Sequence, residues 1–360
     1  MNTEILELTK KLMTFESTKE KPEKLTEIVD FVTDYFKDLP LFIKKYSKNG
    51  KPSIVITFQE TKQPTLILNA HLDVVEAPEE LFIPKIEGDK LFGRGSLDMK
   101  GSAALMMVLV KNLALGGQKP SLSLMLTTDE EIGGHDGVAY LLNDEGYSCD
   151  IVFVPDGGKE FSLIIEEKGI IHFKLKTLGK ACHASRPWEG ESAVDKMVEA
   201  CSKLRQIFPN PRNLEDWKIS FNVGKIQGGD ATNKVADLAE CFCDIRYPGT
   251  EKPQEILAKI EAETGIKPEI IIQGDAFFTS PQNPYFVKYK AIAEKVLERP
   301  IPVTKHPAAT DARFFTARII PVILTEPTGG NAHGAEEWVS INALQKMYQI
   351  LERFITQIKI

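Results

Sequence analysis

Several short apolar segments of this sequence end abruptly in side chains that commonly bind metals. In the segment TLILNAHLDVV, an apolar run of the kind found in buried strands meets His71 and Asp73 directly. A protein core does not accept such polar groups without partners. In open α/β sheets, however, ligand sites lie just beyond the carboxyl ends of the strands. This abrupt change therefore favours a sheet whose strands deliver polar residues to one edge.

The same pattern occurs three more times along the chain. SLSLMLTTD leads to Glu130 and Glu131, IVFVP leads to Asp156, and VILTEPTGGNA leads to His333. Taken singly, each could be an ordinary turn or the start of a helix. Four together predict a cluster of imidazoles and carboxylates at one sheet edge, and two divalent ions are the simplest way to hold that much negative charge.

The order of helix-type and strand-type segments predicts the fold class and the domains. Residues 1–168 and 275–360 alternate helical patterns with apolar runs, which is typical of an α/β domain with a mostly parallel central sheet flanked by helices. Residues 169–274 carry longer alternating strands and two helical patterns, which indicate an inserted α+β domain. A chain of 360 residues exceeds what one core usually serves, so we expect two domains.

Composition argues against several classes of protein. The net charge of -7 does not suit a nucleic-acid-binding surface. The longest apolar stretch, SAALMMVLV, is too short to cross a bilayer, which takes about 20 residues. The amino terminus lacks the apolar centre of a signal peptide, and the five cysteines have no metal-type spacing, so we expect free thiols. These features predict a cytoplasmic protein without nucleic-acid or membrane partners.

Six motifs, taken in order, resemble those of a known family of zinc-dependent hydrolases. That family includes carboxypeptidase G-type enzymes, aminoacylases, succinyl-diaminopimelate desuccinylase, acetylornithine deacetylase and several di- and tripeptidases. The resemblance covers essentially the whole chain. The motifs are NAHLDVV, GRGSLDMKG, TTDEEIGG, VPDGG, GKACHASRP and NAHGAEEWV.

The resemblance implies a dinuclear zinc centre, in which cobalt can replace zinc. One zinc ion would be bound by His71 and Asp156. The other would be bound by Glu131 and His333, with Asp98 bridging the two ions. Two such ions can polarise a carbonyl group and hold a deprotonated water molecule between them.

The resemblance also implies roles for residues around the metals. Glu130 would be the general base, taking a proton from the attacking water and delivering it to the leaving nitrogen. Asp73 would be the outer carboxylate that orients the imidazole of His71. The peptide bond between Asp98 and Met99 is expected to be cis.

The inserted segment resembles the lid and dimerisation domain of the family. The resemblance implies a homodimer formed through this domain, in which His183 is lent to the partner subunit to stabilise the developing oxyanion. Asn233 and Arg246 resemble residues that grip the polar end of the substrate. An ordinary turn residue at Asn233 and a strand residue at Arg246 are the alternatives.

Features that bear on the substrate conflict. Glu166 and Glu167 stand where desuccinylase-like members carry basic residues, and their charge would repel an acidic acyl tail. Asp156 resembles the di- and tripeptidase branch, because the deacylases usually have glutamate there. The chain length instead resembles the compact deacylases. We therefore expect an exopeptidase that acts on di- or tripeptides, with an N-acyl-amino-acid deacylase as the alternative.

Two further alternatives belong to other classes of protein. A noncatalytic binding or dimerisation module would have lost ligands or the base, whereas every expected ligand is present here. Nucleophilic catalysis by serine is not supported because the sequence has no GxSxG motif. Cys182 and His183 are neighbours in sequence, which does not by itself make a nucleophile and base pair.

Overall fold

The computed structural model describes residues 2–358 and divides them into two compact units. The larger unit runs through Ile165 and resumes over Thr279–Thr304 and from Thr310 onward. The smaller unit comprises Glu166–Phe278 together with Lys305–Ala309. Residues 166–168, 275–278 and Lys305–Ala309, which were expected in the first domain, group with the smaller unit.

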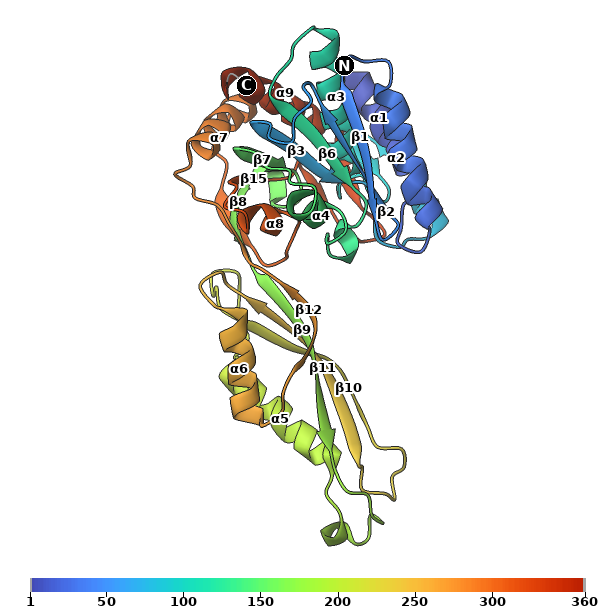
Figure 1. Cartoon of the computed structure of the whole chain (residues 1–360), viewed down its shortest axis with the longest axis vertical. Coiled ribbons are helices and arrows are strands. Elements are labelled where there is room, and N and C mark those ends of the chain that lie inside the picture. The colour runs from blue at the N-terminus through green and yellow to red at the C-terminus, as the bar shows by residue number, and fades with distance from the viewer. Residues whose placement is uncertain (1, 359–360) are drawn as a thin grey trace. The chain divides into compact units, whose positions relative to one another are not determined.

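The larger unit is built on a mixed sheet (Figure 1). Strands β6, β3, β7 and β15 are parallel to one another, and β1, β2 and β8 add antiparallel strands at the two sides. The expected α/β fold with a mostly parallel central sheet is confirmed. In spatial order, the strands are β1 Phe42–Lys48, β2 Lys51–Thr57, β6 Leu122–Thr127, β3 Leu66–His71, β7 Ile151–Val154, β15 Val322–Leu324 and β8 Leu163–Glu167.

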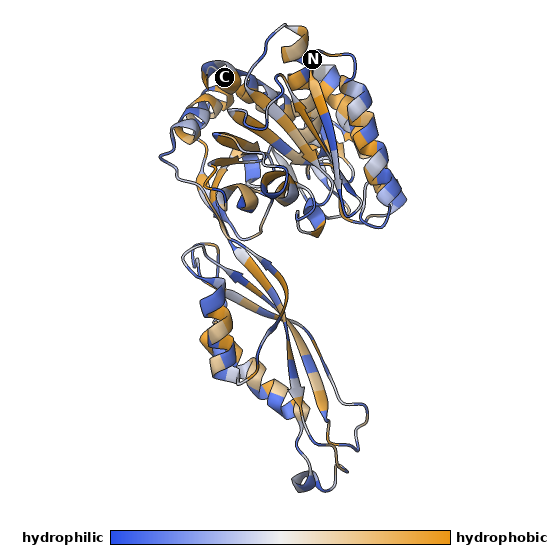
Figure 2. Ribbon diagram, in the orientation of Figure 1, coloured by the Kyte–Doolittle hydropathy of each residue, from blue (hydrophilic) through white to orange (hydrophobic). Residues whose placement is uncertain are grey.

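Helices flank this sheet on both sides (Figure 1). The predicted core helix around SAALMMVLV is α3, whose residues are buried almost throughout because it packs against β3, β6, α1 and α9. Figure 2 shows the corresponding concentration of apolar residues in α3 and the central strands. The helices are α1 Asn2–Met13, α2 Pro22–Phe36, α3 Lys100–Leu115, α4 Val138–Asn143, α7 Pro284–Leu297, α8 Ala312–Thr316 and α9 Ile341–Ile358.

A small antiparallel sheet brings two distant segments of the larger unit together. It pairs β17 with β5, so that Val339 lies opposite Leu91. This pairing places the motif GRGSLDMKG, which follows β5, beside the motif NAHGAEEWV, which runs into β17. The sheet consists of β16 Gly329–Gly330, β17 Trp338–Ser340, β5 Lys90–Phe92 and β4 Lys85–Glu87.

The smaller unit has an α+β arrangement. Two helices pack on an antiparallel sheet of four strands around a separate apolar core that includes Phe173, Leu204 and Ile245. In spatial order, the strands are β10 Ser220–Gly228, β11 Leu238–Tyr247, β9 Gly169–Leu178 and β12 Glu269–Gly274, and the helices are α5 Ala193–Ile207 and α6 Pro253–Thr264. Two short strands, β13 Phe277–Phe278 and β14 Val303–His306, pair with β8.

Two further observations concern the environment of the chain. Over residues 2–358, none of the helices combines the length and the apolar character needed to cross a membrane. All five cysteines are free, as expected, and Cys201, Cys241 and Cys243 are buried.

Candidate metal centre

Three of the five predicted ligands, together with the predicted base Glu130, come from the carboxyl ends of three adjacent strands. His71 is the last residue of β3, Glu130 and Glu131 follow β6, and Asp156 follows β7. Because β6, β3 and β7 are neighbouring parallel strands, these ends meet at one edge of the sheet. The burial of β3 at every position explains the apolar run that precedes His71.

Asp98 lies between the two histidines of the cluster. It precedes α3, and its carboxylate approaches His71 Nε2 at 3.0 Å through Oδ1 and His333 Nε2 at 3.0 Å through Oδ2. His333 Nε2 also lies 3.2 Å from Glu131 Oε2. The peptide bond between Asp98 and Met99 is cis, as expected. The two oxygens of one carboxylate thus face two different imidazoles.

The side chains form two groups with the spacing of metal ligands. Within each group, the candidate ligand atoms all lie within 4.8 Å of one another. The first group is His71, Glu130 and Asp156, and the second is Asp98, Glu131 and His333. Glu130, which the family resemblance implied as the base, thus stands with the candidate ligands of the first group, where a carboxylate can serve as either.

The electrostatics of the cluster fit divalent cations. Burial opposes protonation of His71, but its hydrogen bond to Asp98 and the charges of Asp98, Asp73 and Asp156 raise its pKa well above the ordinary value. Hydrogen bonds to Asp98 and Glu131 raise the pKa of His333 to about 10. These imidazoles therefore hold protons that a cation would replace.

The carboxylates of the cluster point to the same conclusion. Burial favours the neutral form of Asp98, yet its hydrogen bonds with the two histidines lower its pKa below the ordinary value. Burial raises the pKa of Glu130 well above its ordinary value. Glu131 Oε1 is buried without a hydrogen-bond partner, which is costly unless something positive approaches it. The residues present thus fit a pair of divalent cations.

Asp73 contacts His71 differently from the expectation. The His71 Nδ1–H donates to the backbone carbonyl of Asp73 at 2.9 Å, whereas the Asp73 carboxylate lies 3.6 Å from Nδ1, too far for a hydrogen bond. That carboxylate instead accepts the backbone N–H groups of Glu130 at 3.3 Å and Glu131 at 3.1 Å. The carbonyl fixes the tautomer and leaves Nε2 facing Asp98.

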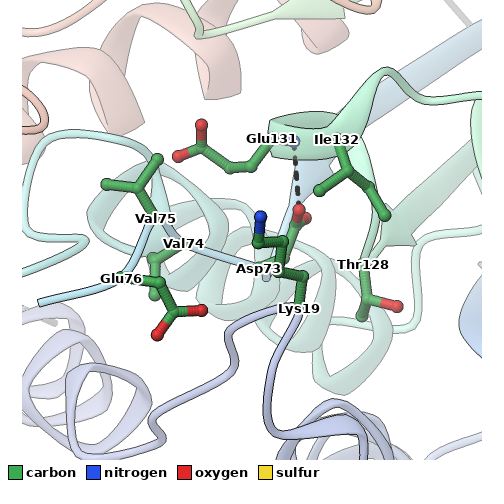
Figure 3. Close-up of a pocket in the computed structure, with 8 residues that line it drawn as sticks. All are labelled: Lys19, Asp73, Val74, Val75, Glu76, Thr128, Glu131 and Ile132. Carbon is green, nitrogen blue, oxygen red and sulfur yellow. Dashed lines mark hydrogen bonds between the residues drawn. The ribbon is translucent and has the colours of Figure 1, made fainter. Parts of the chain in front are cut away.

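A pocket of about 210 Å³ opens beside these groups (Figure 3). Figure 3 shows the ammonium group of Lys19 pointing into it. The volume suits a small side chain or terminal group rather than a polymer. The pocket is lined by Lys19, Asp73, Val74, Val75, Glu76, Thr128, Glu131 and Ile132.

The smaller unit carries His183 and Asn233 close together. His183 is exposed, and its Nδ1 lies 2.8 Å from Ser185 Oγ. The Ala184 N–H donates to the backbone carbonyl of Asn233 at 2.9 Å, and His183 forms an isolated bridge with Lys234. These contacts place the two predicted residues on adjoining loops.

Arg246 lies apart from that pair. It stands near the end of β11, where its Nε donates to Asp244 at 3.0 Å, whereas Asn233 precedes the start of the same strand. Within the smaller unit, the structure therefore does not bring Arg246 and Asn233 together.

Sequence reasoning overlooked four charged residues near the candidate ligands. Arg94 and Glu337 form a buried ion pair, and both stand in quoted motifs, so the signal was a charged residue with no assigned role. Burial raises the pKa of Glu326 to about 8, with a further contribution from the charge of Asp98. Burial also raises the pKa of Asp311 to about 7.

Comparisons with known proteins agree with this geometry. The sequence model of peptidase family M20/M25/M40 matches residues 67–357. Acetylornithine deacetylase of Buchnera aphidicola subsp. Schizaphis graminum is 24% identical over 96% of this chain and 94% of its own.

Solved structures share the fold over the whole chain. Aminopeptidase PepT from Bacillus cereus superposes with a TM-score of 0.82 at 19% identity, covering 100% of this chain and 99% of that one. YXEP from Bacillus subtilis, described as a dinuclear metal-binding peptidase of the M20 family, superposes with a TM-score of 0.70 at 14% identity, covering 99% and 98%. Because the family model spans most of its length, this chain belongs to peptidase family M20/M25/M40 and is a metallohydrolase.

Proposed function

We propose that this metallohydrolase cleaves amide bonds of small peptides, with Glu130 as its general base. The observation that carries the proposal is the position of Asp98, whose two oxygens each lie 3.0 Å from a histidine, between two groups of candidate ligands. A bridging carboxylate of this kind suits a pair of ions held close together.

We assign zinc to both positions, with cobalt as a working substitute. The donor atoms are imidazole nitrogens and carboxylate oxygens, a set that zinc accepts readily. His71 and Asp156 would hold one ion, Glu131 and His333 the other, and Asp98 both. When bound, such ions polarise the scissile carbonyl and lower the pKa of water.

The side chains around the metals would move and direct protons. Glu130 is buried, and burial raises its pKa above the ordinary value, which makes the carboxylate a stronger base for taking a proton from water and passing it to the leaving nitrogen. Asp73 would hold the backbone of Glu130 and Glu131 in place through the two N–H groups that it accepts. In this orientation Glu130 would face the attacking water, and Glu131 would face a metal ion.

Residues of the smaller unit would complete the site. The exposed imidazole of His183 would donate a hydrogen bond to the developing oxyanion. Asn233 and Arg246 would hold polar groups of the substrate. The separation of these two along β11 suits contact with different sites, such as the two sites of a homodimer formed through this unit.

The preferred substrates are di- and tripeptides, and the alternative is an N-acyl amino acid. The charges of Glu166 and Glu167 are only weak evidence against a substrate with an acidic acyl tail. Glu166 pairs with Lys305 at 2.7 Å, and Glu167 pairs with His306 at 3.3 Å. Asp156, in place of the glutamate usual in the deacylases, remains the support for a peptidase. A cytoplasmic location is supported by the five free thiols, which suit a reducing compartment.

A substrate panel tests this proposal. The zinc-loaded protein is assayed for release of free amino acids from unblocked di- and tripeptides, from N-acetyl amino acids and from N-succinyl amino acids. We expect the highest kcat/KM with an unblocked peptide. Faster turnover of N-acyl amino acids would support the deacylase alternative, and no turnover of any member would contradict both.

A further inference from the structure

We infer that Arg94 and Glu337 form a clip that positions two metal ligands, Asp98 between the two ions and His333 at one of them. The clip consists of this buried ion pair together with the backbone groups that it binds. The inference rests on the proposed function, because it requires Asp98 and His333 to be ligands. It adds to that function two positioning residues that bind neither metal nor substrate.

The carboxylate of Glu337 accepts hydrogen bonds from the loop that leads into Asp98. Its Oε1 accepts the N–H of Leu97 at 3.0 Å and that of Asp98 at 3.1 Å. Its Oε2 accepts the N–H of Gly95 at 3.1 Å and the Nη1–H of Arg94 at 2.5 Å. Four donors on one carboxylate fix the backbone from which the Asp98 side chain departs.

Arg94 extends the same network to the other ligand. Its Nη2 donates to the backbone carbonyl of His333 at 2.9 Å and approaches that of Gly334 at 3.3 Å. His333 has a φ of +63°, a left-handed conformation that a non-glycine residue keeps only when its surroundings hold it. The bond from Arg94 supplies such a constraint at the ligand itself.

Burial limits what these two residues can do. The side chain of Arg94 is 3% exposed and that of Glu337 is 1% exposed, so neither offers a surface to a substrate. A buried ion pair adds little to stability compared with apolar packing, but loss of one partner leaves an uncompensated charge. A role in holding Asp98 and His333, whose loops lie far apart in sequence, explains why the charges are placed here.

The second ligand group should respond selectively to the clip. Asp98, Glu131 and His333 form one group, and two of its three members are held by Arg94 and Glu337. His71 and Asp156, in contrast, are positioned by the ends of strands β3 and β7. Substitution of Arg94 or Glu337 should therefore weaken the binding of one metal ion much more than that of the other.

The test uses Glu337→Gln and Arg94→Lys in the full-length protein. Gln keeps the shape but loses the charge, and Lys keeps the charge but loses the forked contact with His333. Asp89→Asn is the matched control. The Asp89 carboxylate accepts a hydrogen bond from Ser340 Oγ–H at 2.5 Å and another from the N–H of Asn342 at 3.0 Å. It thus joins the same two segments, through residues that do not contact the ligands.

Zinc binding to metal-free protein is measured by calorimetry, and cobalt binding by visible absorption. We expect wild type and Asp89→Asn to bind two ions per chain. In Glu337→Gln and Arg94→Lys, the ion held by Glu131 and His333 should bind about 10–100-fold more weakly, which is the usual effect of losing an outer contact of a metal site. The other ion, which shares only Asp98, should lose less affinity.

The outcomes separate the clip from the proposed function. Wild-type affinity for both ions in a folded Arg94→Lys and a folded Glu337→Gln would overturn the clip while leaving the metal centre in place. A wild-type protein that binds no ion would instead contradict the proposed function. Circular dichroism confirms folding, and if Glu337→Gln does not fold, Arg94→Lys alone decides.

Discussion

The carboxylate of Asp73 accepts the backbone N–H of Glu131 at 3.1 Å and so joins the loop after β3 to the loop after β6. Asp73 is buried, and burial raises its pKa to about 7. Replacement by Ala removes this contact and the contact with Glu130, so both glutamates should lose their fixed orientation.

We therefore expect Asp73→Ala to weaken zinc binding by about 10–100-fold. Calorimetric titration of the metal-free variant with zinc measures the change, and circular dichroism checks that the variant is folded. A folded variant with wild-type zinc affinity would show that the two loops keep their places without Asp73.

Glu130 and Glu131 are adjacent, but their substitution by Ala should have different effects. Glu130→Ala should keep both metal ions and lower kcat by about 10²–10⁴-fold, which is the usual contribution of general acid–base catalysis. Glu131→Ala should lose metal, because Glu131 approaches His333 and Asp98 in the second ligand group.

Metal analysis and steady-state kinetics of the two variants decide between these roles. The structure places Glu130 in the first ligand group, so the experiment is informative in either direction. If Glu130→Ala loses one ion per chain, Glu130 is a ligand and the assignment as base is wrong.

The raised pKa of His333 should make the stability of the metal-free protein depend on pH. Its pKa is raised from 6.5 to about 10, so the folded state holds a proton that the unfolded state releases within this range. The folded state binds more protons there, and its free energy of unfolding should fall as pH rises from about 6.5 to 10.

Urea unfolding of metal-free wild type and His333→Gln at several pH values isolates this effect. The stability advantage of the wild type should be largest below pH 6.5 and should shrink as pH approaches 10. A difference that stays constant across the range would show that His333 does not hold an additional proton.

The parallel strands and the candidate ligands at their ends could be predicted because both are encoded locally. An apolar run such as Leu66–Leu68, followed directly by His71, indicates a buried strand and a polar edge without any knowledge of neighbours. The antiparallel pairing of β1 with β2 was not predicted, since β1 is only partly buried and shows no such run.

Contacts between distant segments could not be predicted in this way. Arg94 and Glu337 are 243 residues apart, and only the pairing of β5 with β17 brings them together. The hydrogen bond from His71 was expected to reach the Asp73 side chain, but it reaches the carbonyl, because backbone conformation decides which oxygen faces the ring.

His183 predicts complementation between inactive subunits. It lies exposed in the smaller unit, and we propose that it serves the site of a partner. If so, His183→Ala and Glu130→Ala should each be inactive, yet their mixture should recover up to about a quarter of wild-type activity. Random pairing of equal amounts makes half of the dimers mixed, with one intact site each.

Light scattering after size exclusion establishes whether the chain is a dimer. The two variants are then mixed, subunit exchange is allowed, and the hydrolase activity of the mixture is measured. Mixed dimers that remain as inactive as their parents would indicate that His183 serves its own chain or takes no part in the reaction.

Metal dependence is the central claim, and titration of the metal-free enzyme tests it most directly. Protein stripped with chelator, and shown by elemental analysis to lack metals, is titrated with zinc while hydrolysis of the best peptide substrate is followed. We predict no turnover before zinc is added and a rise in activity that saturates at two zinc ions per chain. Full activity in the metal-free protein, or no binding of zinc by the folded chain, would contradict this account.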